Sequence, residues 1–150
     1  MSWSIEFFED AAGRQPAREF LLALEPSKRA ALIAAIEEVL EPRGLGVCAT
    51  EYGRPLGKGL FEFRVRHDET VIRGKSRDGE EPTGNRRGDV LLRLFCHAYG
   101  DKIILLLAGY DKGEDPSPRR QTREIEQARK RLRSFQLERQ RKSTRGKRRG

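Results

Sequence analysis

The segment VLLRLFCHAYGDKIILLLAGYDK, residues 90–112, is the most strongly patterned part of this chain. Two apolar runs, residues 90–98 and 102–108, flank a short Tyr-Gly-Asp turn, and this pattern predicts a β-hairpin that buries at least one face. Residues 103–108 have no polar side chain, so we expect them to form the central strand of a small sheet. Arg93 interrupts the first run, and a guanidinium is rarely fully buried unless it is paired. A basic residue inside a core hairpin therefore indicates a functional site.

The segments around this hairpin alternate between strand and helix patterns. Helical spacing of apolar residues predicts a helical hairpin near the N-terminus, and a strict two-residue alternation in LFEFRVRH predicts a strand. In chain order we expect a strand over 2–8, helices over 16–24 and 27–40, strands over 60–67, 90–98 and 102–108, and a helix that begins at 118. The predicted class is α+β, with the order β-α-α-β-β-β-α, a small antiparallel or mixed sheet, an N-terminal helical hairpin and a C-terminal helix.

The charge of the chain is concentrated at its C-terminal end. Residues 119–150 contain 14 Lys or Arg and 3 Glu, whereas the other 118 residues carry a net charge of −3. We expect one domain over residues 1–137, followed by a disordered basic tail over 138–150 that favours polyanions such as nucleic acid. Residues 74–89 have no hydrophobic side chain and are expected to form an exposed loop.

Other classes of function find little support in the sequence. No apolar run reaches membrane-spanning length, and no signal-peptide pattern is present, so we expect a soluble, cytoplasmic protein without a membrane partner. Two cysteines make no disulfide framework, and no spacing resembles a zinc site. We therefore expect no metal and no cofactor. His67 and His97 have no recognisable partner, which favours a structural or solvent-exposed role for both.

Alternation places basic side chains on one face of two strands. In LFEFRVRH the apolar residues share one face, and Glu62, Arg64 and Arg66 share the other, which we expect to be solvated. Arg93 lies on one face of the next strand. If the two strands are neighbours, Arg64 and Arg93 lie on the same side of the sheet.

The third strand adds Tyr110 and Lys112 at its end, so this face is basic, contains an aromatic residue and has no metal ligands. Cleavage of RNA by its own 2′-hydroxyl needs no metal, but it needs donors for the charge that develops on the phosphate. Arginine supplies fixed donors for phosphate oxygens. Lysine neutralises charge, and tyrosine can stack on a base or donate a proton. The residues alone leave a second interpretation open, in which these are ordinary solvated strand faces.

Four short motifs, in the same order along the chain, resemble those of the RelE/ParE superfamily of bacterial toxins, in particular its phage-derived RelE/HigB-like branch. They are GLFEFR at residues 59–64, the arginine of LLRLF, the segment LLLAGYDKG, and PSPRRQTREIEQARKRLRSF, in which prolines precede a helix. The resemblance covers residues 3–135. It implies the α+β fold described above.

The resemblance also implies an activity. The chain would be the toxin of a type II toxin–antitoxin system, a metal-independent endoribonuclease that cleaves messenger RNA on the ribosome and arrests translation. Its partners would be mRNA, the ribosome and an antitoxin of the helix-turn-helix type. The catalytic residues would be Arg64, Arg93, Lys112 and Tyr110. Further contacts to RNA are expected from four basic residues: Lys58, Arg66, Arg119 and Arg120.

A second function stays open, namely a non-catalytic nucleic-acid-binding or gyrase-inhibiting protein of the same superfamily. Relatives commonly have a second basic residue where this chain has Gly113, and the basic C-terminal segment suits binding as well as catalysis. The three basic residues Arg64, Arg93 and Lys112 favour cleavage.

Overall fold

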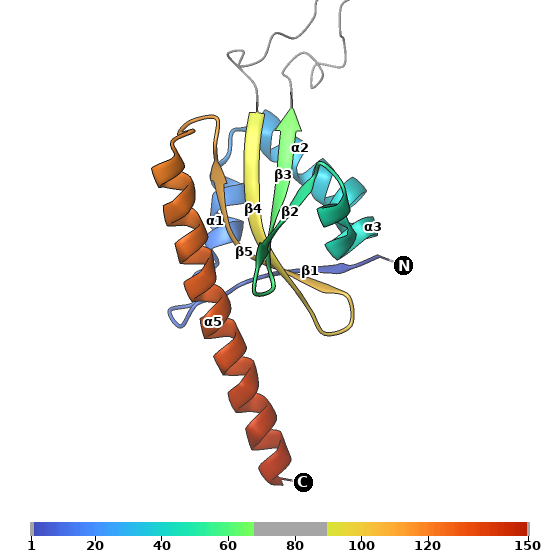
Figure 1. Ribbon diagram of the computed structural model, residues 1–150, viewed down its shortest axis with the longest axis vertical. Helices are drawn as coiled ribbons and strands as arrows, with labels where there is room; N and C mark the ends of the chain where they lie inside the picture. Colours follow the sequence, from blue (N-terminus) through green and yellow to red (C-terminus); the bar gives the residue numbers. More distant parts are fainter. Residues whose placement is uncertain (1, 68–89, 150) are drawn as a thin grey trace, which may run out of the picture.

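The structure is a computed structural model that describes residues 2–67 and 90–149 (Figure 1). The loop expected at 74–89 lies outside the described residues. The strands are β1 (Ser4–Phe7), β2 (Gly53–Gly57), β3 (Leu60–His67), β4 (Val90–Tyr99) and β5 (Ile103–Asp111). The helical segments are α1 (Pro16–Ala23), α2 (Pro26–Ala35), the π-helical turn η1 (Ile36–Leu40), α3 (Glu41–Arg43), the 3-10 segment η2 (Gly44–Ala49) and α5 (Pro118–Arg149).

The strands of the described residues form one mixed sheet in the order β1-β5-β4-β3-β2. β1 pairs with β5 in parallel, and the other neighbours are antiparallel. The predicted α+β class is therefore confirmed. Two details of the prediction were wrong: β4, not the strand at residues 103–108, is the middle strand, and the edge strand β2 was expected to be a loop. The sequence of β2, GRPLG, has one large apolar residue and no alternation, so its pattern does not predict a strand.

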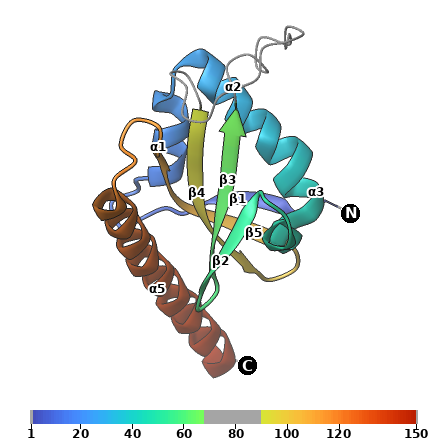
Figure 2. The ribbon, with the colours of Figure 1, turned by 45° about the horizontal axis from the view of Figure 1, so that its top comes forward.

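The helical segments α1, α2 and α3 lie over one face of the sheet, and α5 runs across the other (Figures 1 and 2). The core between these helical segments and the sheet contains Leu32, Phe61 and Phe63, each at most 1% exposed. The core beneath α5 contains Phe95 and Leu105. The sheet thus buries both of its faces, which explains the continuous apolar run in β5.

A β-bulge in β5 decides which residues reach the face beneath α5. Phe95 pairs with Ala108 and Cys96 with Leu106, so Leu107 is an extra residue. Leu105 and Leu107 face α5 before the bulge, and Ala108 and Tyr110 face it afterwards. The bulge therefore shifts the alternation of the strand, so that Ala108 and Tyr110 lie on the same face as Arg93. Asp111 lies on the opposite face and forms an ion pair with Lys28.

Helix α5 begins as its sequence predicts and ends later than expected. The Ser117 Oγ accepts a hydrogen bond from the Arg120 backbone N–H at 3.2 Å, as an N-cap does, and Pro118 follows it. A narrow apolar stripe docks on the sheet: Ile125, Ala128, Leu132 and Phe135. The tail expected to be disordered over 138–150 is helical as far as Arg149. No proline follows Pro118, and Glu, Gln, Lys and Arg, which favour helices, make up much of this segment.

The helix has about 32 residues at about 1.5 Å each, so its length is about 48 Å. Its C-terminal half extends past the sheet (Figure 1). Within the described residues, no helix has both the length and the apolar character needed to cross a membrane.

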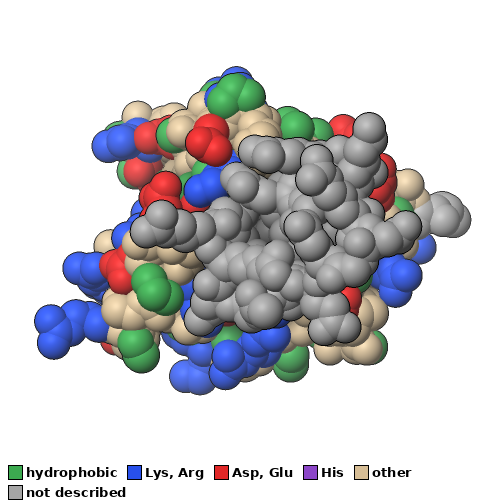
Figure 3. All heavy atoms as spheres, turned by 90° about the horizontal axis from the view of Figure 1, so that it is seen from above, with side chains coloured by type: hydrophobic (Ala, Val, Ile, Leu, Met, Phe, Trp, Pro, Cys, Tyr) green, Lys and Arg blue, Asp and Glu red, His purple; other side chains and the backbone are tan. Residues whose placement is uncertain are grey.

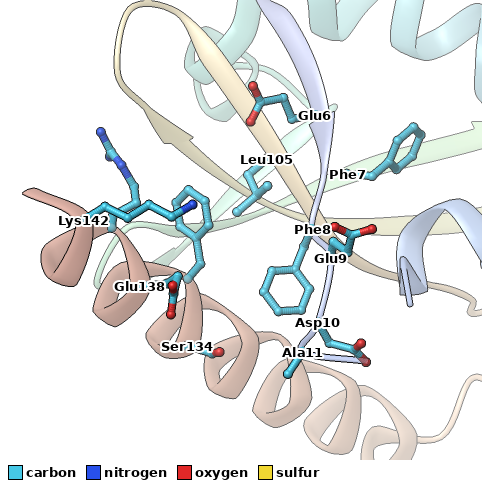
Figure 4. Close-up of a pocket in the computed structure, with 12 residues that line it drawn as sticks. Glu6, Phe7, Phe8, Glu9, Asp10, Ala11, Leu105, Ser134, Glu138 and Lys142 are labelled. Carbon is cyan, nitrogen blue, oxygen red and sulfur yellow. The ribbon is translucent and has the colours of Figure 1, made fainter. Parts of the chain in front are cut away.

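A small polar and aromatic cluster holds the middle of α5 to the sheet. The Tyr99 hydroxyl donates a hydrogen bond to the Glu6 carboxylate, and Phe135 packs edge-on against the Tyr99 ring at 4.8 Å between centroids. The Arg139 guanidinium lies 4.5 Å from the centre of the same ring. Glu6 and Leu105 also line a pocket between the end of β1 and α5 (Figure 4). Burial, with the hydrogen bond to Glu6, raises the pKa of Tyr99 to about 12.

This pKa predicts how the cluster responds to pH. Because the pKa of Tyr99 in the folded state lies above its ordinary value of about 10, the contribution of the phenol to stability is complete below pH 10 and is lost as the pH rises through 12. We expect the difference in unfolding free energy between the wild type and Tyr99→Phe to stay constant up to about pH 9 and to shrink above it. Denaturant titrations of both proteins at several pH values measure this difference in unfolding free energy. A difference that grows with alkaline pH would contradict the hydrogen bond.

Candidate functional site

A cleft of about 600 Å³ opens on the α5 side of the sheet, where β3 ends and β4 begins. It lies between these strands, the end of β5 and the segment before β2. Eight residues line it: Glu51, Tyr52, Arg64, Arg66, Leu91, Arg93, Lys112 and Pro116. Four of the eight are basic. Arg64 and Arg66 come from β3, Arg93 comes from β4, and Lys112 directly follows β5. The bulge in β5 explains the last of these, because it turns Lys112 toward this face.

Two arginines face each other at the centre of this cleft. Arg64 and Arg93 are directly paired across β3 and β4, which places like charges on neighbouring strands. Glu62 lies between them: its Oε1 is 3.2 Å from the Arg64 Nε and 3.0 Å from the Arg93 Nε. One carboxylate thus compensates two guanidinium groups.

The burial of this cluster corrects the expected solvated face. Glu62 is 1% exposed and Arg93 is 9% exposed, on the face of the sheet against which the apolar stripe of α5 packs. Arg64 is half-buried. The alternation predicted the correct face of β3, but it could not predict that a helix would cover this face. Arg93, which the alternation placed on the outer face of its strand, is buried and forms an ion pair with Glu62, as a buried guanidinium usually does.

The surroundings of Arg93 affect its protonation. Burial lowers the pKa of the Arg93 guanidinium, and the Glu62 carboxylate acts in the opposite direction. Arginine stays protonated at neutral pH despite such a change. Within the described residues of this cluster, the Glu62 Oε2, the Arg93 Nε and the Tyr110 Oη are buried without a hydrogen-bond partner, so the 3.0 Å contact of Arg93 with Glu62 is an ion pair without hydrogen-bond geometry. The cluster is therefore charged, and some of its buried polar atoms have no hydrogen-bond partner.

Tyr110 does not have the position expected of a catalytic residue. It is 1% exposed, lies nearly parallel to the Phe95 ring at 6.0 Å, and is not among the residues that line the cleft. The Arg120 guanidinium covers it at 5.5 Å from the ring centre. Burial raises the pKa of the Tyr110 hydroxyl. In this structure the residue supports the sheet beside Arg93 and cannot stack on a base.

The four basic residues expected to contact RNA lie in different places. Arg66 lines the cleft. Lys58, with φ +55°, lies in the turn between β2 and β3, at the opposite end of β3 from the cleft. Arg119 is exposed in the first turn of α5, close in sequence to Pro116. The Arg120 Nε forms an ion pair with the Glu124 Oε1 at 2.8 Å, within α5. Arg66 is therefore the member of this set that the structure brings to the cleft.

Tyr52 and Glu51 line the cleft and were not expected there. Tyr52 is half-buried, and its backbone oxygen accepts a hydrogen bond from the Arg64 N–H at 2.7 Å. The sequence signal for this site was Tyr52 itself, an aromatic residue directly before β2, but β2 was not recognised as a strand. The role of Glu62 was also missed, although it is the one acidic residue on a strand face with Arg64 and Arg66.

His97 has a structural role. Its Nδ1 lies 2.9 Å from the Gly59 oxygen, and its ring is 6.3 Å from the Tyr99 ring. The side chain of His67 lies outside the described part of the structure. No group of three or more His, Cys, Asp or Glu side chains in the described residues could hold a metal ion. The cleft offers fixed cations, one aromatic ring and one carboxylate, a set suited to an RNA phosphate and its neighbouring base.

Comparison with known proteins finds no protein-family model that matches this chain and no similar curated protein.

Proposed function

We propose that this chain is the toxin of a type II toxin–antitoxin system, a metal-independent endoribonuclease that cleaves mRNA at the ribosome and arrests translation. The observation that carries the proposal is the cleft in which Arg64 and Arg93 face each other beside Lys112. The motif resemblance to RelE/HigB-like toxins supports the same activity, and it also suggests a helix-turn-helix antitoxin as partner and a cytoplasmic location.

The proposed reaction is attack of an RNA 2′-oxygen on the adjacent phosphorus. The bond to the 5′-oxygen breaks, the 2′-proton leaves to a base, and the products are a 2′,3′-cyclic phosphate and a 5′-hydroxyl. Arg64 and Arg93 neutralise the charge on the phosphorane oxygens. Lys112 is the candidate to donate a proton to the leaving 5′-oxygen, and Glu51 is the candidate base.

Tyr52 takes the role that was expected of Tyr110. It lines the cleft at the edge of the sheet, where its ring can stack on a base next to the scissile phosphate. Stacking positions the RNA, so this residue acts on binding more than on the chemical step.

A non-catalytic nucleic-acid-binding function, including inhibition of gyrase, is the second candidate. It is favoured by one observation, that Glu62 already engages both central arginines and so reduces the charge available to a phosphorane. Binding depends less on any one cation than transition-state stabilisation does, because the affinity for a nucleic acid is the sum of many phosphate contacts.

Induced expression in bacterial cells tests the proposed activity. We expect the wild-type chain to arrest growth and to produce new transcript ends within coding regions, as mapped by primer extension. Arg64→Ala should prevent both effects, because it removes one donor to the phosphate. Arg18→Ala on α1, an exposed residue on the other side of the sheet, should leave both effects unchanged. Growth arrest without new transcript ends would favour the non-catalytic candidate.

A further inference from the structure

Two groups of basic residues on α5 differ in the direction in which they point. Those of the first group contact the body of the domain. Arg129 donates to the Gly57 oxygen at 3.2 Å and Arg131 donates to the Leu107 oxygen at 3.3 Å. With Arg139, which covers the Tyr99 ring, these residues hold the helix in place. Their role is structural.

The second group forms an exposed stripe along the opposite side of the helix. We define the outer stripe as four residues: Arg119, Arg123, Lys130 and Arg141. All four are exposed. They are spaced by 4, 7 and 11 residues, each spacing close to a whole number of helical turns, so they follow one side of the helix. That side lies opposite the buried Ala128 and Leu132.

One acidic residue, Glu126, is exposed on the same side of the helix, three residues after Arg123 and four before Lys130, so the stripe carries four positive charges and one negative charge. Within the described part of the chain, no acidic side chain forms an ion pair with Arg119, Arg123 or Lys130, and Arg141 has a distant partner in Glu138 at 3.7 Å. One large apolar residue, Leu137, lies on the same side of the helix and is 54% exposed. A single apolar side chain is too little for insertion into a membrane surface. The chemistry of the stripe therefore suits a flexible polyanion.

The stripe begins next to the cleft. Pro116 lines the cleft, and Arg119 follows three residues later. The cleft is lined by Arg64, Arg66 and Arg93 on the face of the sheet that α5 crosses, so the start of the stripe and the cleft lie on the same side of the sheet. Viewed from above, Lys and Arg side chains gather toward the left and lower margins of the molecule (Figure 3). From Arg119 to Arg141 the stripe extends over about 33 Å.

We propose that the outer stripe binds the RNA strand where it leaves the cleft, so that α5 is a second docking element for the substrate. This inference rests on the proposed function for its choice of RNA. The cleft contacts the phosphate that reacts, and the stripe contacts phosphates further along the same strand. The affinity for RNA should then depend on the length of the strand, whereas the chemical step should not depend on the stripe.

Binding of 2′-O-methyl RNA, which lacks the attacking hydroxyl, tests this inference. The probes are single strands of about 5 and about 20 nucleotides, in the range of known single-strand sites and beyond it. The variant is Arg119→Gln/Arg123→Gln/Lys130→Gln. The matched control is Arg18→Gln/Arg43→Gln/Lys102→Gln, which removes the same charge from exposed positions outside α5.

For the longer probe we expect the stripe variant to lose about tenfold or more in affinity. The slope of log affinity against log salt should become shallower by about 2, because each phosphate contact on a single strand contributes about 0.7 and the variant removes three charges. Affinity for the shorter probe should stay within about twofold, and the control should behave as the wild type. Equal losses in the stripe variant and the control would overturn the inference, and so would tighter binding of duplex DNA than of the longer RNA. A wild-type protein that binds as expected but cleaves no RNA would contradict the proposed function and leave this docking surface standing.

Discussion

Replacing Arg93 by alanine should reduce RNA cleavage by about 10²–10³-fold, the usual cost of one lost donor to a developing charge. The same change should destabilise the domain by about 3 kcal/mol, the lower end of the range for a broken buried ion pair. The reason is Glu62, which is 1% exposed and would lose one of its two cationic partners. Arg64 still reaches the carboxylate at 3.2 Å, which limits the loss. Single-turnover cleavage and urea unfolding measure the two effects.

Two companion variants separate catalysis from stability. In Glu62→Gln/Arg93→Ala the buried position is neutral, so part of the lost stability should return while cleavage stays low. Arg93→Lys should restore cleavage only partly, because an ammonium is a point charge and not a planar fork of donors. An Arg93→Ala protein with wild-type stability and wild-type cleavage would refute both roles of this residue.

Replacing Leu105 by aspartate should abolish soluble folding. Leu105 is 2% exposed, lies in β5 between β1 and β4, and belongs to the core beneath α5. An unpaired charge there costs several kcal/mol, which is a large share of the about 5–15 kcal/mol that stabilises a typical domain.

Soluble yield and cooperative thermal unfolding measure the effect of Leu105→Asp. Leu22→Asp is the matched control, because the same substitution is made at a side chain that is 52% exposed. It should leave a soluble protein that unfolds cooperatively. If Leu105→Asp unfolded at the same temperature as this control, the placement of β5 would be wrong.

The sequence was most informative where periodicity was strict. The alternation of LFEFRVRH predicted β3 and the face on which Arg64 lies, and the Ser-Pro pair before α5 predicted its N-terminus. The placement of Arg64 and Arg93 on one side of the sheet followed from the assumption that β3 and β4 are neighbours, which the register confirms; their direct pairing was not predicted. These features are local, and local patterns in a sequence record them.

The missed features depend on contacts between segments that are distant in the sequence. Residues 53–57 form an edge strand because β3 offers a partner, not because GRPLG favours a strand. Tyr110 is buried because it packs with Ala128 and Leu132 of α5, and Glu62, on the same face of the sheet, is 1% exposed. The bulge at Leu107, which turns Lys112 toward the cleft, has no glycine to mark it. Such tertiary effects override what one segment indicates by itself.

The chemical identity of the RNA ends produced by the purified protein in EDTA tests the proposed activity most directly. We expect cleavage to continue in EDTA and to leave a 2′,3′-cyclic phosphate, or the 3′-phosphate that forms from it, because the attacking group is the 2′-oxygen of the RNA and the charge is neutralised by Arg64 and Arg93. Products that end in a 3′-hydroxyl, or cleavage that stops in EDTA, would instead mean attack by a metal-activated water and would contradict a reaction carried out by this arginine cleft.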